Sequence, residues 1–213
     1  MNIETSSPGR QEPYDGQFFA SQRGGSISSA KVIVPLVLET FPSASVVDVG
    51  CGVGGWVAEY MRHGVERVLG VDGDYVDLAS LEIPADRFQS ADLSRPLDLG
   101  SFDLAMSLEV AEHLPEDCAE TFVDTLTKAA PIVVFSAAVP EQGGVNHVNE
   151  QWPSYWIRKF AARGYVVEDC IRPAIWNDER VKWWYRQNIF VFRRQTGTAT
   201  PETAVSPEIL DCI

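Results

Sequence analysis

Short apolar runs alternate with longer mixed stretches along most of this chain. Such runs predict strands buried on both faces, because the strands of a parallel sheet are covered by helices above and below. We expect a short third strand just before Asp92 and six others at residues 46–49, 68–72, 102–107, 131–138, 165–171 and 188–193. Helices are predicted at residues 28–41, from residue 56 onward and at residues 152–163. The alternation predicts an α/β fold with a mostly parallel sheet.

The two ends of the chain lack this alternation. Residues 1–26 are mostly polar and rich in Gly, Ser and Pro, and residues 195–213 show no hydrophobic period. Segments of this kind cannot bury enough apolar surface to offset the entropy of ordering. We therefore predict a flexible N-terminal arm over residues 1–26, one folded domain over residues 27–194 and a mobile C-terminal tail over residues 195–213.

The first predicted strand ends in a glycine-rich turn, Gly50-Cys51-Gly52-Val53-Gly54-Gly55, with Asp48 two residues before it. Glycines let backbone N–H groups approach a ligand closely, and the following helix points its N-terminus at that ligand. The second strand ends at Asp72, whose carboxylate is placed to accept both hydroxyls of a ribose. These features predict a cradle for a nucleotide-like cofactor.

The glycine spacing alone does not identify the cofactor. Gly50, Gly52 and Gly55 also satisfy the G-x-G-x-x-G pattern of dinucleotide-binding proteins, and a tight turn without any ligand is a further interpretation. Two more motifs narrow the choice, namely Asp92 after the third strand and the fourth strand at residues 102–107. Taken in order, the series resembles the class I S-adenosylmethionine-dependent methyltransferases.

This resemblance implies a Rossmann-like three-layer sandwich with a seven-stranded, mostly parallel sheet whose last strand is antiparallel. It also implies that S-adenosylmethionine lies over the glycine turn, with one acid at its ribose and another at its adenine amino group. The expected cofactor-binding residues are Asp48, Gly50, Cys51, Gly52, Gly54, Asp72, Gly73, Ala91, Asp92, Leu93 and Leu108. In the family a leading arm often closes over the cofactor, so we expect either such a lid or plain surface anchors from Tyr14, Phe18 and Phe19.

Two of the three histidines follow the fourth and fifth predicted strands. If residues 109–113 form one helical turn, Glu109, Glu112 and His113 share a face, because residues three and four apart are neighbours on a helix. His147 from the next loop would complete a set of two carboxylates and two imidazoles suited to a divalent metal ion. The set is similar to the metal site of small-RNA 2'-O-methyltransferases, and it resembles ubiquinone-pathway O-methyltransferases too.

Two metal-free interpretations of these residues stay open. In one, His147 or His113 acts as a general base beside Glu112, since a neutral imidazole accepts a hydroxyl proton near pH 7. In the other, the histidines are structural and the transfer depends on positioning. We expect activity without a metal, with His147 as the more important histidine because its loop should border the acceptor.

Composition limits the partners. The formal net charge is -13, and without a basic stripe a long nucleic acid is not expected to bind. No apolar run approaches the ~20 residues of a membrane helix, and no secretory leader opens the chain. The four cysteines lack metal or disulfide spacing, which suits a reducing cytoplasm. We expect a cytoplasmic protein with a small-molecule acceptor, and no feature of the sequence sets its oligomeric state.

Aromatic residues gather late in the chain, where five of the six tryptophans follow residue 150. Members of the resembled family usually build the acceptor pocket from this half, and residues 146–156 look like those of methyltransferases found near sugar and cell-surface biosynthesis genes. The predicted function is O-methylation of a small molecule or sugar. The alternatives are an NAD(P)-dependent oxidoreductase, disfavoured because it would leave Asp92 and residues 109–113 unexplained, and a non-catalytic nucleotide-binding protein.

Overall fold

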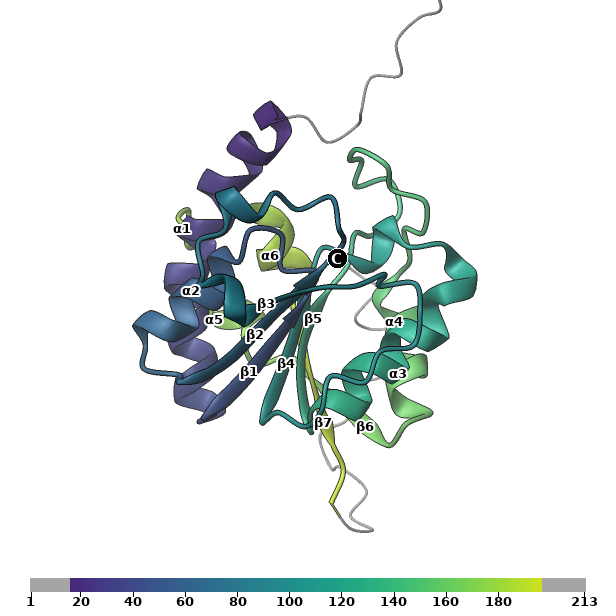
Figure 1. Cartoon of the computed structure of the whole chain (residues 1–213). Helices are drawn as coiled ribbons and strands as arrows, with labels where there is room; N and C mark the ends of the chain where they lie inside the picture. The colour runs from purple at the N-terminus through teal and green to yellow at the C-terminus, as the bar shows by residue number, and fades with distance from the viewer. Residues whose placement is uncertain (1–15, 197–213) are drawn as a thin grey trace, which may run out of the picture.

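A single twisted sheet forms the centre of the molecule (Figure 1). The structure, a computed structural model, describes residues 16–196, with side chains from residue 25 onward. The seven strands lie in the order β3-β2-β1-β4-β5-β7-β6. Their bounds are β1 Ser45–Val49, β2 Arg67–Asp72, β3 Phe88–Ser90, β4 Leu104–Leu108, β5 Ile132–Ser136, β6 Tyr165–Glu168 and β7 Phe190–Arg194. Strand β7 pairs antiparallel with both β5 and β6, and the remaining pairs are parallel, which confirms the predicted sheet.

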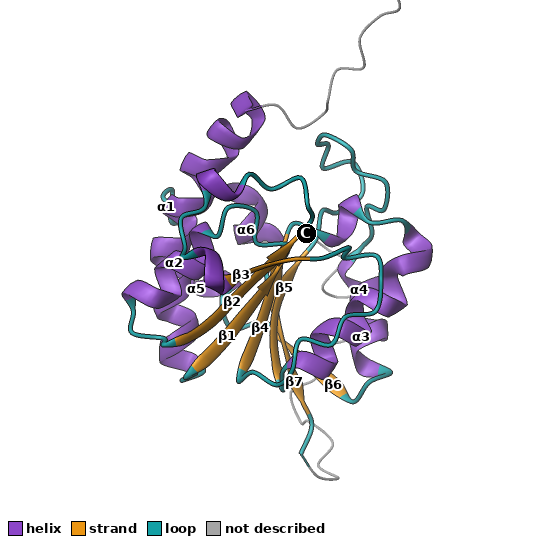
Figure 2. Cartoon of the chain, in the orientation of Figure 1, coloured by secondary structure: helices purple, strands orange, loops and turns teal. Residues whose placement is uncertain are grey.

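Helices cover both faces of this sheet (Figure 2). The α-helices are α1 Gly16–Thr40, α2 Gly55–Arg62, α3 Ala119–Ala129, α4 Pro153–Ala161, α5 Arg172–Ile175 and α6 Trp183–Asn188. Short 3-10 turns are η1 Leu78–Ser80, η2 Ala85–Arg87, η3 Ala111–His113 and η4 Glu116–Cys118. Among the described helices, none is long and apolar enough to cross a membrane.

Each face of the sheet carries its own hydrophobic core. One core joins α1, α2, α5 and α6 to side chains such as Val46, Leu104 and Val134. The other joins α3 and α4 to the strand neighbours of those residues, such as Val47 and Ala105. Because successive strand residues point to opposite faces, strands that are apolar throughout supply both cores. This is the three-layer arrangement expected from the sequence.

The first helix is longer than its sequence predicts. We expected a helix over residues 28–41 capped by Ser28 or Ser29, but α1 begins at Gly16, so these serines lie inside it and donate hydrogen bonds to the Gly25 carbonyl. A Cβ at Gly25 would lie 2.5 Å from Cε of Lys182, so this glycine reflects close packing and not a loop. The expected lid residues Tyr14, Phe18 and Phe19 lie outside the described side chains.

The sheet order places one crevice at the carboxyl ends of the strands. Strand β1 lies between β2 and β4, so the chain reverses its direction of winding there. Ligands of open α/β sheets bind at such a switch point. The glycine turn after β1 and Asp72 at the end of β2 lie together at this switch point.

Candidate active site

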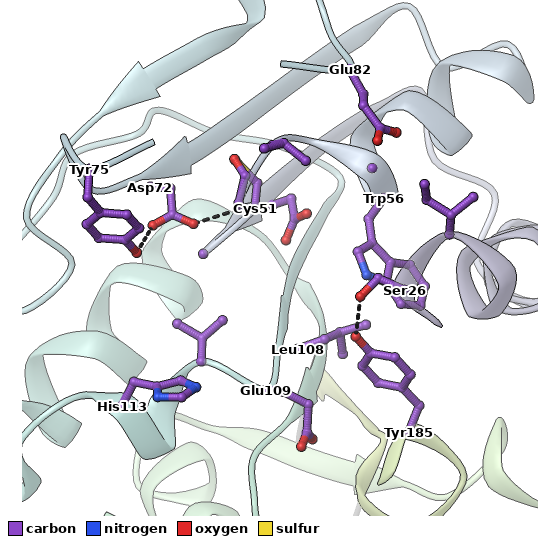
Figure 3. Close-up of a pocket in the computed structure, with 17 residues that line it drawn as sticks. Ser26, Cys51, Trp56, Asp72, Tyr75, Glu82, Leu108, Glu109, His113 and Tyr185 are labelled. Atoms are coloured by element: carbon purple, nitrogen blue, oxygen red, sulfur yellow. Dashed lines mark hydrogen bonds between the residues drawn. The ribbon is translucent and has the colours of Figure 1, made fainter. Parts of the chain in front are cut away.

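The glycine turn after β1 forms one wall of a cavity of ≈ 200 Å³ (Figure 3). Gly50, Gly52 and Gly54 have φ angles of 90°, 54° and 87°, a region that favours glycine. A Cβ at Gly52 would meet no atom within 4 Å, so its backbone faces open space. A Cβ at Gly50 would collide with Val110, and one at Gly54 would lie 2.8 Å from Ile83. Gly52 therefore suits ligand approach, whereas packing also requires the other two glycines.

Asp72 stands at the end of β2 beside this turn. Its carboxylate accepts hydrogen bonds from the backbone N–H of Gly52 at 2.6 Å and of Gly73 at 2.7 Å, and from the hydroxyl of Tyr75. Figure 3 shows the Tyr75 hydroxyl at the edge of the carboxylate. The fixed, buried acid fits the predicted ribose partner.

Asp48 is a second buried acid in the same cavity. Burial, together with the nearby charge of Asp72, raises the pKa of Asp48 to about 8. Its Oδ2 atom has no hydrogen-bond partner among the described residues. A buried polar atom without a partner is costly, so this one is available to a polar group of a bound ligand.

A neighbouring hollow also has Tyr75 in its wall and is lined by four more of the expected cofactor-binding residues. Gly73, Ala91, Asp92 and Leu93 lie along it. The carboxylate of Asp92 accepts hydrogen bonds from the backbone N–H and the hydroxyl of Ser94, which lower the pKa of this exposed acid. The two hollows share Tyr75, so a ligand lying across both would pass this side chain.

A separate pocket of ≈ 240 Å³ adjoins the cofactor cavity. Glu109 and His113 line both spaces. The rest of the wall comes from three elements far apart in the sequence, η3, the loop between β5 and α4, and the start of α6. Its other lining residues are Glu112, Gln142, Gly143, Gly144, Val145, His147, Trp183 and Trp184. Leu108 and Cys51 line only the first cavity.

The structure brings together three of the four expected metal ligands. One ligand atom from each of Glu112, His113 and His147 lies within 4.8 Å of the others, and Glu109 does not belong to this group. The expected helical turn over residues 109–113 is wrong, because Glu109 has a φ of 56° and η3 begins only at Ala111. Glu109 therefore lines the same pocket but lies outside the cluster of possible metal ligands.

The Glu109 carboxylate belongs to a network of amides. It accepts hydrogen bonds from Nε2 of Gln142 at 2.8 Å and from Nδ2 of Asn188 at 3.1 Å, and Asn188 also donates to Oε1 of Gln142 at 2.8 Å. Burial raises the pKa of Glu109, although these hydrogen bonds oppose the shift. The network joins the end of β4 to the loop that carries His147 and to α6.

The two histidines of the pocket are each oriented by a contact at Nδ1. Nδ1 of His147 lies 2.8 Å from Oε1 of Glu150, and Nδ1 of His113 lies 3.4 Å from the Asn146 carbonyl oxygen. The two rings meet edge to face with centroids 4.9 Å apart. Burial, with His147 nearby, lowers the pKa of His113, so this imidazole is neutral near pH 7.

The loop around His147 has an unusual backbone. Glu109, Glu141 and Asn146 are the described non-glycine residues with positive φ, and all three flank this pocket. A Cβ at Gly144 would collide with the His147 ring, so the ring lies directly against the loop backbone. Residues held in sparsely populated backbone regions concentrate at functional sites. The conformation is consistent with a loop shaped for binding and not only for connection.

Glu112 is the most buried acid of the group, with 1% of its surface exposed. Burial raises its pKa well above the usual range, and the nearby Glu109 adds to the rise. Its Oε2 atom has no partner within the described part of the chain. Together with the imidazoles, this oxygen gives the pocket a hydrogen-bonding floor.

A sheet of this order, with a nucleotide cradle at its switch point and a polar pocket beside it, defines the class I methyltransferase fold. Residues 47–129 match the family model described as a methyltransferase domain. The chain therefore carries a methyltransferase domain and has the fold of the class I S-adenosylmethionine-dependent methyltransferases. The match favours the methyltransferase interpretation over the NAD(P)-dependent oxidoreductase. A search of curated protein sequences finds no match.

Solved structures share the fold at low sequence identity. The sugar N-methyltransferase KedS8 from Streptoalloteichus sp ATCC 53650 is 18% identical over 92% of this chain and 99% of its own, with a TM-score of 0.65. The methyltransferase domain of bacterial CtHen1-C is 20% identical over 79% and 98%, with a TM-score of 0.59. The small RNA methyltransferase HEN1 is 17% identical over 92% of this chain and 28% of its own, with a TM-score of 0.55.

Several lining residues were not predicted from the sequence. Tyr75 and Ser26 line the cofactor cavity, and Tyr185 joins them there, where its hydroxyl lies 3.2 Å from Oγ of Ser26. The Ser26–Tyr185 contact spans most of the chain and leaves no local signal. Glu150 follows His147 by three residues, a spacing that could have pointed to the pair.

Proposed function

We propose that this chain methylates a hydroxyl oxygen of a small molecule, with sugars among the candidates, and that the acceptor lies in the pocket bordered by His147 and Trp183. We call this space the acceptor pocket. The observation that carries the proposal is that Glu109 and His113 line both this pocket and the cofactor cavity. A methyl donor in one space and an acceptor in the other would therefore meet at that border.

The residues of the first cavity fit the cofactor. Asp72 offers a fixed carboxylate, Gly52 an open backbone and Asp48 an oxygen without a partner. When bound, S-adenosylmethionine supplies a methyl group on a sulfonium, which is reactive enough that alignment and removal of the acceptor proton are the remaining requirements. The chain has to supply those two.

His147 is the residue that we assign to proton removal. Its Nδ1 hydrogen bond to Glu150 fixes the tautomer in which Nε2 is the proton acceptor. The Glu150 carboxylate would stabilise the imidazolium that forms when His147 takes the acceptor proton. Glu112 and His113 then position the acceptor through hydrogen bonds at the pocket floor.

A divalent metal ion is a second candidate, favoured by the unpartnered Oε2 of Glu112 within the group Glu112, His113 and His147. The residues fit, since both histidines already have the outer hydrogen-bond partners that metal-binding imidazoles usually have. An ion held by these residues would supply Lewis acidity that lowers the pKa of the acceptor hydroxyl.

The test combines substrate screening with chelation. Neutral glycosides, phenols and amino sugars are incubated with the protein and S-adenosylmethionine, and the products are analysed by mass spectrometry. We expect a methyl group on oxygen, a rate that is unchanged by EDTA and a loss of roughly 10² to 10⁴ in His147→Ala. Methylation of nitrogen alone would overturn the proposal. Activity lost in EDTA and restored by Mg²⁺ or Mn²⁺ would select the metal.

The similar structures differ in the class of acceptor that they methylate. KedS8 is a sugar N-methyltransferase, whereas HEN1 is a small RNA methyltransferase. The acidic character of this chain, with a net charge of -13, favours a small acceptor over a nucleic acid. A short RNA belongs in the same screen as the comparison substrate.

A further inference from the structure

We infer that the acceptor pocket selects an uncharged saccharide ring, with Trp183 as the stacking wall and without a Lys or Arg in the described lining to hold an anionic acceptor. The inference rests on the proposed function and narrows its substrate class. It draws on four observations, namely the exposed indole, the absence of Lys and Arg from the described lining, the polar floor and the size of the space.

Trp183 presents an exposed aromatic surface inside this polar pocket. The residue is 47% exposed at the first position of α6, and its ring lies at 83° to that of Trp184 with centroids 5.7 Å apart. Trp184 packs in turn against the core shared by α1 and α2. Trp183 is thus supported from one side and open on another. The C–H face of a pyranose is an apolar, slightly positive surface that complements the negative face of an indole.

The lining supplies no Lys or Arg side chain that could pair with an anion. Its ionisable residues in the described part of the chain are two acids and two histidines, and the Glu150 carboxylate lies 2.8 Å from Nδ1 of His147. The neighbouring Lys182 packs its side chain against Gly25 of α1, and its Nζ lies 6.0 Å from the centroid of the Trp184 ring. A phosphate or carboxylate on the acceptor would therefore enter this space without a Lys or Arg partner in the lining.

The Glu150 carboxylate argues against an amine as acceptor. Carboxylates favour the protonated form of a nearby amine, and an ammonium has no lone pair with which to attack a methyl group. Hydroxyls have no such penalty. The Glu112 Oε2 atom and the two imidazoles supply acceptors and a donor at one place, which matches the adjacent hydroxyl groups of a sugar.

The size of the space fits one ring. Its volume of ≈ 240 Å³ lies below the range of about 300–1,000 Å³ that is usual for drug-sized ligands. An oligosaccharide acceptor would place only its terminal sugar unit in this pocket. We therefore expect recognition of a single sugar unit.

The test is a binding measurement on protein saturated with S-adenosylhomocysteine. Methyl pyranosides of the gluco, galacto, manno and rhamno configurations are screened by saturation-transfer NMR, with the 6-phosphates of the first three as charged comparators. We expect at least one neutral glycoside to bind at least tenfold more tightly than its phosphate. Trp183→Ala should weaken that binding tenfold or more. Trp176→Ala is the matched control, because Trp176 is 51% exposed but lies outside the described pocket lining.

Each contrary outcome overturns the inference. These outcomes are the absence of binding by every neutral glycoside, equal or tighter binding of the phosphates, and equal effects of the two tryptophan substitutions. Titration of every variant with S-adenosylhomocysteine separates this failure from failure of the proposed function. A protein that binds the cofactor product and methylates phenols, but ignores glycosides, keeps the proposed function and loses the saccharide.

Discussion

Nδ1 of His147 lies 2.8 Å from Oε1 of Glu150, three residues further along the same loop. Both side chains are largely buried, with 13% and 21% of their surfaces exposed. Hydrogen bonds from His147 and from the Glu141 backbone N–H lower the pKa of Glu150 against the opposing effect of burial. Glu150 is thus ionised near neutral pH and fixes the orientation of the imidazole.

This pair predicts non-additive kinetics. Glu150→Gln removes the charge that stabilises the imidazolium, so we expect kcat to fall by roughly 10² at unchanged affinity for S-adenosylhomocysteine. His147→Ala should cost at least as much. The double variant should be no slower than His147→Ala alone, because Glu150 acts through the histidine. Losses that multiply in the double variant would show that the two residues act separately.

Asp72 and Asp92 should contribute unequally to cofactor affinity. Asp72→Asn replaces a buried charge that accepts from two backbone N–H groups, and charge-assisted hydrogen bonds are worth roughly 1.5–3 kcal/mol each. We expect its affinity for S-adenosylhomocysteine to fall by about 10- to 100-fold in calorimetric titration. Asp92→Asn should cost less, since this exposed acid is already engaged by Ser94. Equal or reversed losses would remove the ribose assignment.

Tyr75→Phe should tighten cofactor binding. The Tyr75 hydroxyl donates to the Asp72 carboxylate in this structure, and a ribose hydroxyl would have to replace it there. Removal of one competing hydrogen bond is worth about 0.5–1.5 kcal/mol, or about two- to tenfold in affinity. The substitution keeps the aromatic ring and removes only the hydroxyl. Weaker binding by the variant would mean that the hydroxyl contacts the bound cofactor.

Asp48 predicts a pH dependence of stability without ligand. Its pKa rises from the ordinary 3.8 to about 8 on folding, so the folded state binds the extra proton between these values. The stabilisation is complete below about pH 4 and is lost as pH rises through about 8.

Asp48→Asn removes this titration. The free energy of unfolding of the wild type should therefore fall relative to the variant between pH 5 and 8, with a limiting slope of about 1.4 kcal/mol per pH unit. Urea unfolding of both proteins at several pH values provides the measurement. A difference that stays constant over this range would contradict a neutral Asp48.

The sheet and the cofactor cradle could be predicted because their signals are local. Apolar runs mark the strands, and the turn after β1 needs glycine at positions with positive φ. The prediction for Glu109 was wrong for a nonlocal reason. Its left-handed backbone is held by Ser136, Gln142 and Asn188, which come from three later parts of the chain. No helical periodicity can report such a constraint.

The start of α1 and the position of Tyr185 in the cofactor cavity also could not be predicted from local sequence patterns. The pair Gly24-Gly25 is typical of a loop, but Gly25 lies against Lys182, where a larger residue would collide. Tyr185 reaches the cofactor cavity only because α6 packs beside α1, as the Ser26–Tyr185 contact shows. Tertiary packing overrides local propensity in both cases.

Glu109 and His113 border both the cofactor cavity and the acceptor pocket, so we expect the methyl group to be transferred at these two residues. A crystal structure of the protein with S-adenosylhomocysteine tests it without knowledge of the acceptor. We expect the ribose hydroxyls to bind Asp72 and to displace Tyr75 from that carboxylate. We also expect the sulfur atom to lie beside Glu109 and His113, with the side that carries the methyl group in the cofactor facing His147. A sulfur atom that faces away from the acceptor pocket, or a ribose held elsewhere, would contradict this placement of cofactor and acceptor.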